Sequence, residues 1–160
     1  MLTELLLLPA LYLVVADVDR LIVETSPAIV SVVPLDENRK LLRLPDLDFP
    51  MRVVARCSSG GTPESISISI ADTRVSFSRE ALSEDNVLET SIRVASRQTA
   101  PVAVEGFCSS VAAPSEPLLL NTALTAQVSL RCVRDNGQSI AFRARALDVF
   151  VNCAPEATAD

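Results

Sequence analysis

The chain has 160 residues, of which 49% are hydrophobic and 4% aromatic, and its net charge is −6. This length is sufficient for one domain with a sizeable core. An acidic chain with only 14 Lys and Arg residues is unsuited to nucleic acid, because phosphate binding requires clustered basic side chains. The absence of histidine excludes Ser–His–Asp and Cys–His hydrolases and removes the commonest neutral metal ligand.

An apolar run opens the chain. It extends over 12 residues from Leu5 to Ala16, whereas a helix that spans a bilayer needs about 20. The run fits the hydrophobic region of a secretory signal peptide, with small residues before a cleavage site at Ala16. A strand or helix buried in the domain is the alternative interpretation. We therefore expect a signal peptide or apolar leader at 1–16, a single domain at 17–153 and a flexible tail at 154–160.

Two short β-branched segments follow, at 20–25 and 28–33, separated by Ser26 and Pro27. Proline cannot donate to a strand ladder and is confined to edges and strand ends. The segments therefore predict either one edge strand broken by proline or two short strands.

From residue 51 onward, apolar and polar residues alternate, which is the period of side chains in a strand with one buried face. In 65–71 three isoleucines alternate with serines, a spacing that no helix gathers on one face. Antiparallel strands of this kind predict a two-sheet sandwich. The positions expected to face the core are Met51, Val53, Ala55, Cys57, Ile66, Ile68, Ile70, Val75, Phe77, Leu88, Thr90, Ile92, Val94, Val102, Val104, Gly106 and Cys108.

Residues 109–121 form the longest irregular stretch and contain Leu118, Leu119 and Leu120 near its end. Long loops in compact domains are often functional. The three leucines are either a partner-binding knob or the start of the next strand, and the strand is the favoured interpretation.

The segments 123–133 and 138–153 predict a final hairpin with a three-residue loop, Asp135-Asn136-Gly137, in which glycine is left-handed. Pairing residues whose numbers sum to 272 aligns the two apolar faces. These faces comprise Leu124, Ala126, Val128, Leu130 and Cys132 on one strand and Ile140, Phe142, Ala144 and Ala146 on the other. After Ala146 the apolar parity changes, which predicts a β-bulge. The residues of the new parity are Leu147, Val149, Val151 and Cys153.

Cys57 and Cys108 lie on the expected core faces of two strands, 51 positions apart. This arrangement resembles the immunoglobulin-like sandwich, in which a disulfide links strands B and F of opposite sheets. The resemblance implies an all-β fold of seven to nine antiparallel strands and a Cys57–Cys108 disulfide. The chain has no tryptophan, so Ile68 or Ile70 is expected to occupy the place of the family's tryptophan. Gly106 stands where the family has a tyrosine.

Four cysteines behind a leader predict two disulfides with three possible connectivities. We expect Cys57–Cys108 with Cys132–Cys153, and the main competitor is Cys108–Cys132 with Cys57–Cys153. A zinc site is disfavoured, because spacings of 51, 24 and 21 residues contain no C-x₂-C pair.

Two D-x-D pairs, Asp17 with Asp19 and Asp46 with Asp48, could contribute to a calcium site. Calcium takes six to eight oxygen ligands, so plain acidic loops are the favoured interpretation. No cofactor or metal is therefore expected.

These features predict a non-catalytic binding or structural module that is secreted, periplasmic or extracellular. It would contact a protein partner through loops or an edge strand, with neither nucleic acid nor a stable membrane span involved. The candidate contacts are Leu118, Leu119 and Leu120, and the candidate edge strand is 20–33. One alternative is an assembly subunit that polymerises through the N-terminal apolar segment. Another is a carboxylate-dependent glycosidase with a pair such as Glu89 and Glu105, whose expected outward positions favour a role in solubility.

Overall fold

The computed structural model describes residues 18–32, 41–42, 44–99, 102–103, 117–120 and 122–153. Within these stretches the backbone forms twelve strands and two short 3₁₀ helices. The first six strands are β1 (Arg20–Thr25), β2 (Ala28–Val32), β3 (Leu41–Leu42), β4 (Leu47–Arg56), β5 (Thr62–Ile70) and β6 (Thr73–Ser78). The others are β7 (Val87–Val94), β8 (Val102–Ala103), β9 (Leu118–Leu120), β10 (Thr125–Arg134), β11 (Gly137–Ala146) and β12 (Val149–Cys153). The helices are η1 (Arg79–Ala81) and η2 (Ser96–Gln98).

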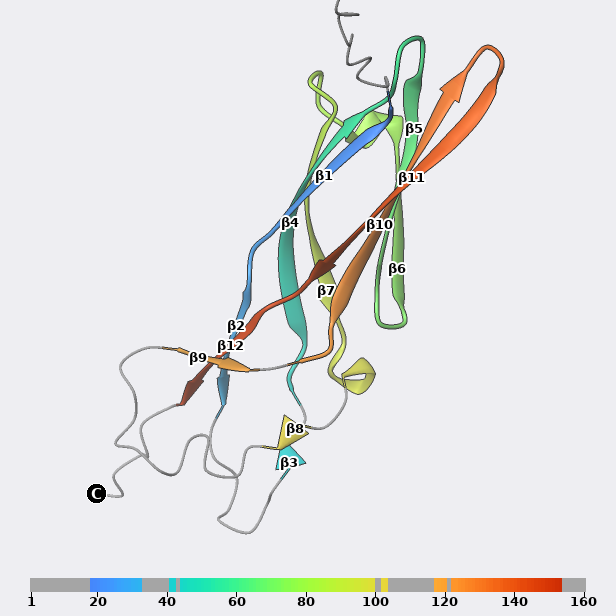
Figure 1. The fold of residues 1–160 in the computed structure, drawn as a ribbon. Helices are drawn as coiled ribbons and strands as arrows, with labels where there is room; N and C mark the ends of the chain where they lie inside the picture. Colours follow the sequence, from blue (N-terminus) through green and yellow to red (C-terminus); the bar gives the residue numbers. More distant parts are fainter. Residues whose placement is uncertain are drawn as a thin grey trace, which may run out of the picture.

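Two antiparallel sheets form the body of the molecule (Figure 1). One has the strand order β1-β4-β7 and the other β11-β10-β5-β6. Their inner faces share one cluster of buried apolar side chains, as expected of a sandwich. The predicted all-β sandwich is therefore confirmed. The prediction of seven to nine strands is too low, because short strands at one end raise the number in the described residues to twelve.

The predicted alternation accounts for most of the core. In β5 the three isoleucines are fully buried, while the serines between them are only half-buried. Val75 and Phe77 of β6 are partly buried against the same cluster. The predicted positions that are buried are Met51, Val53, Ala55, Ile66, Ile68, Ile70, Leu88, Ile92, Val94, Ala126, Val128, Leu130 and Cys132.

Two small sheets lie at the end of the sandwich away from the β10–β11 turn (Figure 1). The strand structure is interrupted at Ser26 and Pro27, so β1 and β2 are two strands rather than one. β2 runs parallel to β12, which also pairs antiparallel with β9. β3 and β8 form a separate antiparallel pair.

The β10–β11 hairpin differs from its predicted register by one residue. Its turn consists of Asp135 and Asn136 alone, because Gly137 is already paired with Arg134. Gly137 has a φ of 144°, so a glycine is required at this position, although the loop is shorter than predicted. Facing residues therefore have numbers that sum to 271, not 272.

The shift of one residue reverses the face of β11, because side chains alternate along a strand. The predicted core residues Ile140 and Phe142 are 52% and 72% exposed, and Ala144 and Ala146 are exposed as well. The residues facing the buried positions of β10 are instead Ser139, Ala141, Arg143 and Arg145.

The predicted β-bulge after Ala146 is also wrong. The inner positions of β11 have odd numbers, as do the buried Leu147, Val149 and Val151 that follow. The parity of the strand is thus continuous from β11 into β12. The apolar pattern changes there only because arginines occupy two inner positions, 143 and 145.

The disulfide joins Cys57 to Cys132. The predicted Cys57–Cys108 and Cys132–Cys153 pairs are wrong, and so is the competing connectivity. Cys57 follows the buried face of β4 and Cys132 lies on the buried face of β10, in the opposite sheet, with 5.8 Å between their Cα atoms. The segment that leads to Cys108 begins at β8, at the other end of the molecule (Figure 1).

Several predictions fall outside the described residues. They are the leader at 1–16, Val33, the segment 104–116 with Cys108, the side chains of Val102, Leu118 and Cys153, and the tail at 154–160. These predictions stand as expectations.

Candidate functional site

The disulfide lies where local irregularities in two strands bring the cysteines together. After Cys57 the chain turns so tightly that a Cβ on Gly61 would lie 2.9 Å from the Cys57 Cβ, so only glycine fits without a shift. The β5–β10 pairing shifts by one residue between Arg131 and Cys132, beside Pro63. Proline has no N–H to donate to the ladder and is found at such irregularities. The turn and the bulge set the two cysteines opposite each other.

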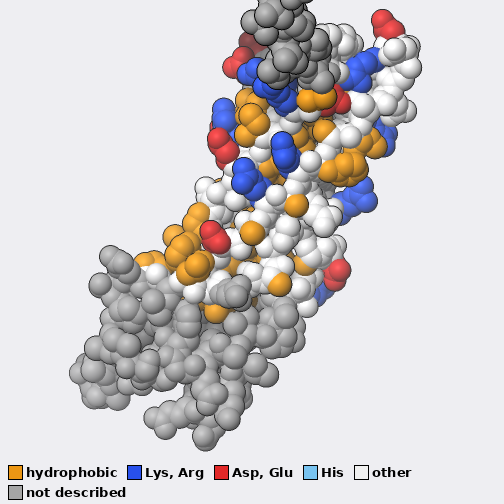
Figure 2. Space-filling view, viewed as in Figure 1, with side chains coloured by type: hydrophobic (Ala, Val, Ile, Leu, Met, Phe, Trp, Pro, Cys, Tyr) orange, Lys and Arg blue, Asp and Glu red, His pale blue; other side chains and the backbone are white. Residues whose placement is uncertain are grey.

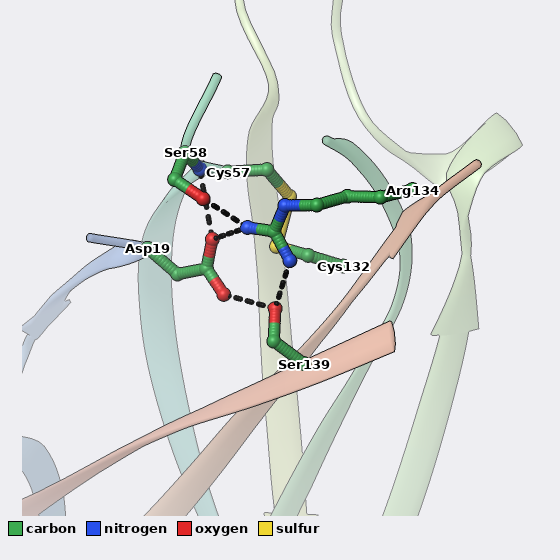
Figure 3. The surroundings of a disulfide bond; sticks show 6 residues. All are labelled: Asp19, Cys57, Ser58, Cys132, Arg134 and Ser139. Atoms are coloured by element: carbon green, nitrogen blue, oxygen red, sulfur yellow. Dashed lines mark hydrogen bonds and ion pairs between the residues drawn. A yellow bond between two sulfur atoms is a disulfide. The ribbon is translucent and has the colours of Figure 1, made fainter. Parts of the chain in front are cut away.

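Asp19 forms the centre of a polar cluster beside the disulfide (Figure 3). Its Oδ1 accepts hydrogen bonds from the Ser58 backbone N–H at 2.8 Å and from an Arg134 Nη2 at 2.6 Å. Its Oδ2 accepts a hydrogen bond from the Ser139 hydroxyl. Arg134 also donates to the hydroxyl oxygens of Ser58 and Ser139. One carboxylate thus joins the chain before β1, the turn after β4 and the β10–β11 hairpin.

The environment of Asp19 keeps it ionised. Burial raises the pKa of its carboxyl, but the hydrogen bonds from Ser139, Ser58 and Arg134 together outweigh burial and lower the pKa from 3.8 to about 2. The side chains of Arg134 and Asp19 are 20% and 10% exposed. A paired and largely buried carboxylate of this kind stabilises the fold and has no free oxygen for acid–base chemistry.

Asp19, Cys57 and Cys132 lie close enough together to suggest a metal site. Both sulfurs, however, are joined in the disulfide and cannot act as thiolate ligands. Both oxygens of Asp19 already accept hydrogen bonds. The cluster is therefore a structural link between the sheets.

The second D-x-D pair has two structural roles. Asp46 accepts a hydrogen bond from the Ser96 N–H at 2.8 Å, at the start of η2. Asp48 forms an exposed ion pair with Arg93 at 3.2 Å, across the β4–β7 ladder. The two carboxylates thus bind groups of this chain separately, and Asp17 of the first pair lies outside the described residues.

The proposed catalytic carboxylates do not gain support from their placement. Glu89 is exposed on the outer face of β7, where its carboxylate lies 3.8 Å from Arg52 on β4. Surface pairs of this kind contribute little to stability. Glu105 lies outside the described residues.

A shallow open depression of about 540 Å³ lies beside the disulfide end of the four-stranded sheet. Its charged lining residues are Glu64, Arg79, Glu80, Arg134 and Asp135. Because its lining includes both acidic and basic side chains, the depression favours neither an anion nor a cation.

An apolar row crosses the outer face of the small β2–β12–β9 sheet. Phe150 of β12 is paired with Ile29 of β2 on one side and with Leu119 of β9 on the other. Ile29 and Leu119 are 59% and 57% exposed, and Phe150 is half-buried between them. Figure 2 shows hydrophobic side chains gathered at this end of the described surface.

The structure places Leu119 and Leu120 in different environments, two of the three leucines that the sequence suggested as a contact. They form β9, which confirms that they are a strand. Leu119 is exposed, whereas Leu120 is 5% exposed and belongs to the core. The other members of the apolar row are Ile29, which lies in the candidate edge 20–33, and Phe150, which the sequence does not indicate because the parallel pairing of β2 with β12 has no local signal.

No known protein family matches the chain, and no curated protein is similar to it in sequence. Within the described part of the chain, no helix has the length and hydropathy required to cross a bilayer.

Proposed function

We propose that this protein is a non-catalytic binding module with an immunoglobulin-like sandwich, working outside the cytoplasm. In immunoglobulin-like domains strands A, B and E of one sheet face C, F and G of the other, and a disulfide joins B to F. The first sheet here contains β1, β4 and β7, and the second contains β5, β10 and β11, in the corresponding chain order. The disulfide runs from the end of β4 to β10, which correspond to strands B and F.

The disulfide also supports the location. Disulfides form and persist in oxidising compartments and are rare in the cytosol. The apolar run from Leu5 to Ala16 has the length and composition of the hydrophobic region of a secretory signal. Both features favour a periplasmic or extracellular protein.

The observation that carries the binding function is the apolar row of Ile29, Phe150 and Leu119. Exposed apolar residues scattered singly need no explanation, but contiguous ones mark surfaces that are covered in use. These three side chains occupy adjacent positions on three neighbouring strands. They form a continuous strip that a partner protein can cover.

The test is to capture partners from the envelope or secreted fraction of the native host with immobilised protein. The variant Ile29→Ser/Leu119→Ser removes both exposed ends of the row and leaves the buried Leu120 intact. We expect recovery of the partner to fall about tenfold, as when a central apolar contact is lost.

The matched control is Ile22→Ser, which removes another exposed apolar residue, 48% exposed, from the outer face of β1. It should leave recovery unchanged. Equal recovery with the wild-type protein and the Ile29→Ser/Leu119→Ser variant would contradict the proposal.

A further inference from the structure

β11 is a free edge of the four-stranded sheet, and its outward backbone groups can be assigned. The Leu147 N–H donates to the Leu124 carbonyl at 3.0 Å, so this facing pair is hydrogen-bonded. In an antiparallel ladder hydrogen-bonded pairs alternate with pairs whose N–H and C=O groups point away. With the observed register, the residues of β11 that point away from β10 are the even-numbered ones, including Ile140, Phe142 and Ala144.

The same residues carry exposed apolar side chains. Ile140 is 52% exposed and Phe142 72%, both on the outer face of the sheet. Proteins usually protect a free edge with charged residues or proline. At the opposite edge of this sheet the equivalent outward positions of β6 are polar, namely Arg74, Ser76 and Ser78. The outer face of β11 therefore lacks the polar side chains that β6 has there, and the charges of β11, Arg143 and Arg145, lie on its opposite face.

The neighbouring edge, that of β1, is covered by β11 itself. Arg143 Nε donates to the Leu21 carbonyl at 3.2 Å, and Arg145 Nε donates to the Val23 carbonyl at 3.0 Å. Figure 2 shows basic side chains in the region where β1 and β11 approach each other, beside hydrophobic side chains over β11. The backbone of β1 is thus partly paired, whereas the backbone groups of β11 that point away from β10 have no hydrogen-bond partner among the described residues.

The charge of the β11 edge indicates the chemistry of the strand that it binds. Arg143 and Arg145 are exposed, and neither forms an ion pair with a carboxylate of the described residues. They lie two positions apart, on the face of β11 opposite to Ile140 and Phe142. A second copy that paired antiparallel with this edge about Phe142 would place Arg143 of both copies within diagonal reach of each other, and like charges at this range are destabilising. An acidic strand would neutralise them.

We infer that the β11 edge binds an extended segment of another protein, which adds as a fifth strand. The segment has apolar residues at alternate positions, against Ile140 and Phe142, and carboxylates between them, against Arg143 and Arg145. Its backbone pairs with the outward N–H and C=O groups of β11, as in other cases of strand addition. This surface is distinct from the apolar row on the β2–β12–β9 sheet.

The probe is a fluorescent heptapeptide of alternating valine and glutamate, and its counterpart has lysine in place of glutamate. Fluorescence anisotropy with the folded, oxidised protein should show binding of the glutamate peptide and at least about tenfold weaker binding of the lysine peptide. Ala144→Pro removes an outward N–H without breaking the β10 ladder, and Phe142→Ser removes the exposed ring. Each should weaken binding about tenfold.

The controls are Arg131→Gln, which changes an arginine on the neighbouring strand, and Leu119→Ser, which changes the apolar row. Both should bind the peptide as the wild-type protein does. Absence of binding, equal binding of the two peptides, or unchanged binding by Ala144→Pro and Phe142→Ser would each overturn the inference. The inference would also be overturned if the wild-type protein sedimented as a dimer and the Ala144→Pro variant as a monomer. The β11 edge would then bind a second copy of this chain.

The proposal for the apolar row and the inference for the β11 edge can be contradicted independently of each other. If the Ala144→Pro variant still captures the host partner and the peptide does not bind the wild-type protein, the β11 inference is wrong and the apolar row remains the binding surface. If the peptide binds but the Ile29→Ser/Leu119→Ser variant captures the partner normally, the apolar row is not the binding surface.

Discussion

Asp19 links segments that lie far apart in the sequence, since its partners are Ser58, Arg134 and Ser139. A charged group that accepts several hydrogen bonds is held more strongly in the folded chain than in the unfolded one. For Asp19 this preference appears as the lowered pKa of its carboxyl. The residue thus adds a polar link to the covalent link of the disulfide.

We expect Asp19→Asn to lower the free energy of unfolding by about 2 kcal/mol at pH 7, the equivalent of lowering the pKa from 3.8 to about 2. Urea unfolding of the oxidised protein measures the difference. The control is Asp48→Asn, whose ion pair with Arg93 is exposed and should contribute less than about 1 kcal/mol. Equal losses for the two variants would contradict the structural role of Asp19.

The same pair of proteins should respond to pH. The folded pKa of Asp19 lies below the unfolded value, so its contribution is fully present above about pH 4 and is lost as the pH falls through 2. The stability difference between the wild-type protein and Asp19→Asn should therefore shrink between pH 4 and pH 2. A difference that stays constant over this interval would show that the carboxylate charge is not its source.

At the scale of the strand, β5 and β11 show what the sequence could and could not predict. Ile66, Ile68 and Ile70 alternate with serines, and only one face of β5 can be buried. In β11 two signals conflict, because its apolar residues have even numbers while the two-residue turn places the odd-numbered ones inward. The two-residue turn and the arginine contacts with β1 are consistent with the observed register of β11. Contacts between strands of different sheets leave no local pattern in the sequence.

The disulfide pairing predicted from the sequence is wrong because it, too, depends on which strands lie opposite each other. Apolar residues alternate along 102–108 as they do along β10, so both segments resemble a core strand. Only the sheet order shows that β10 lies across from β4. Of the apolar row, the sequence indicates Leu119 and, within the candidate edge 20–33, Ile29, but it indicates neither Phe150 nor the adjacency of the three residues, which depends on long-range pairing. The local sequence pattern thus predicts which face of a strand is buried, whereas the partner of a strand or of a cysteine depends on the topology of the sheets.

The arginine contacts between β11 and β1 should be measurable. Arg145→Ala removes the donor to the Val23 carbonyl and should lower the free energy of unfolding by about 1 kcal/mol, the scale of one hydrogen bond to a charged group that is partly exposed. Hydrogen exchange of β1 amides should quicken at the same time. Arg131→Ala is the control, because its ion pair with Glu64 at 3.9 Å is exposed. Equal effects of the two changes would show that the contact with β1 is not stabilising.

At the scale of the molecule, the disulfide and the polar cluster lie at one end, and the apolar row lies at the other (Figure 1). The two main sheets are thus fastened together at the end that holds the N-terminal start of β1. Among the described residues, the opposite end carries the short strands β2, β3, β8, β9 and β12 and the exposed apolar row. This division separates the part that fixes the fold from the surface that we propose for binding.

The connectivity itself gives the last prediction. Peptide mapping without reduction should recover a crosslinked fragment that contains Cys57 and Cys132. If the four cysteines form two disulfides, as their number predicts, the remaining bond must join Cys108 to Cys153. A fragment that links Cys57 to Cys108 would contradict the observed strand arrangement, because it would require residues 102–108 to lie across from β4.

Removing the bond should be costly as well, because it closes a long loop between the two main sheets. In the chain-entropy model a bond between residues 75 positions apart stabilises the fold by about 4 kcal/mol. Cys57→Ala/Cys132→Ala should therefore lower the free energy of unfolding by this amount in urea. Asp19 should lose part of its effect in the same background, since the disulfide and the carboxylate hold the same segments together and neighbouring contributions are not additive. Additive losses would instead show that the bond and the polar cluster stabilise the sandwich independently.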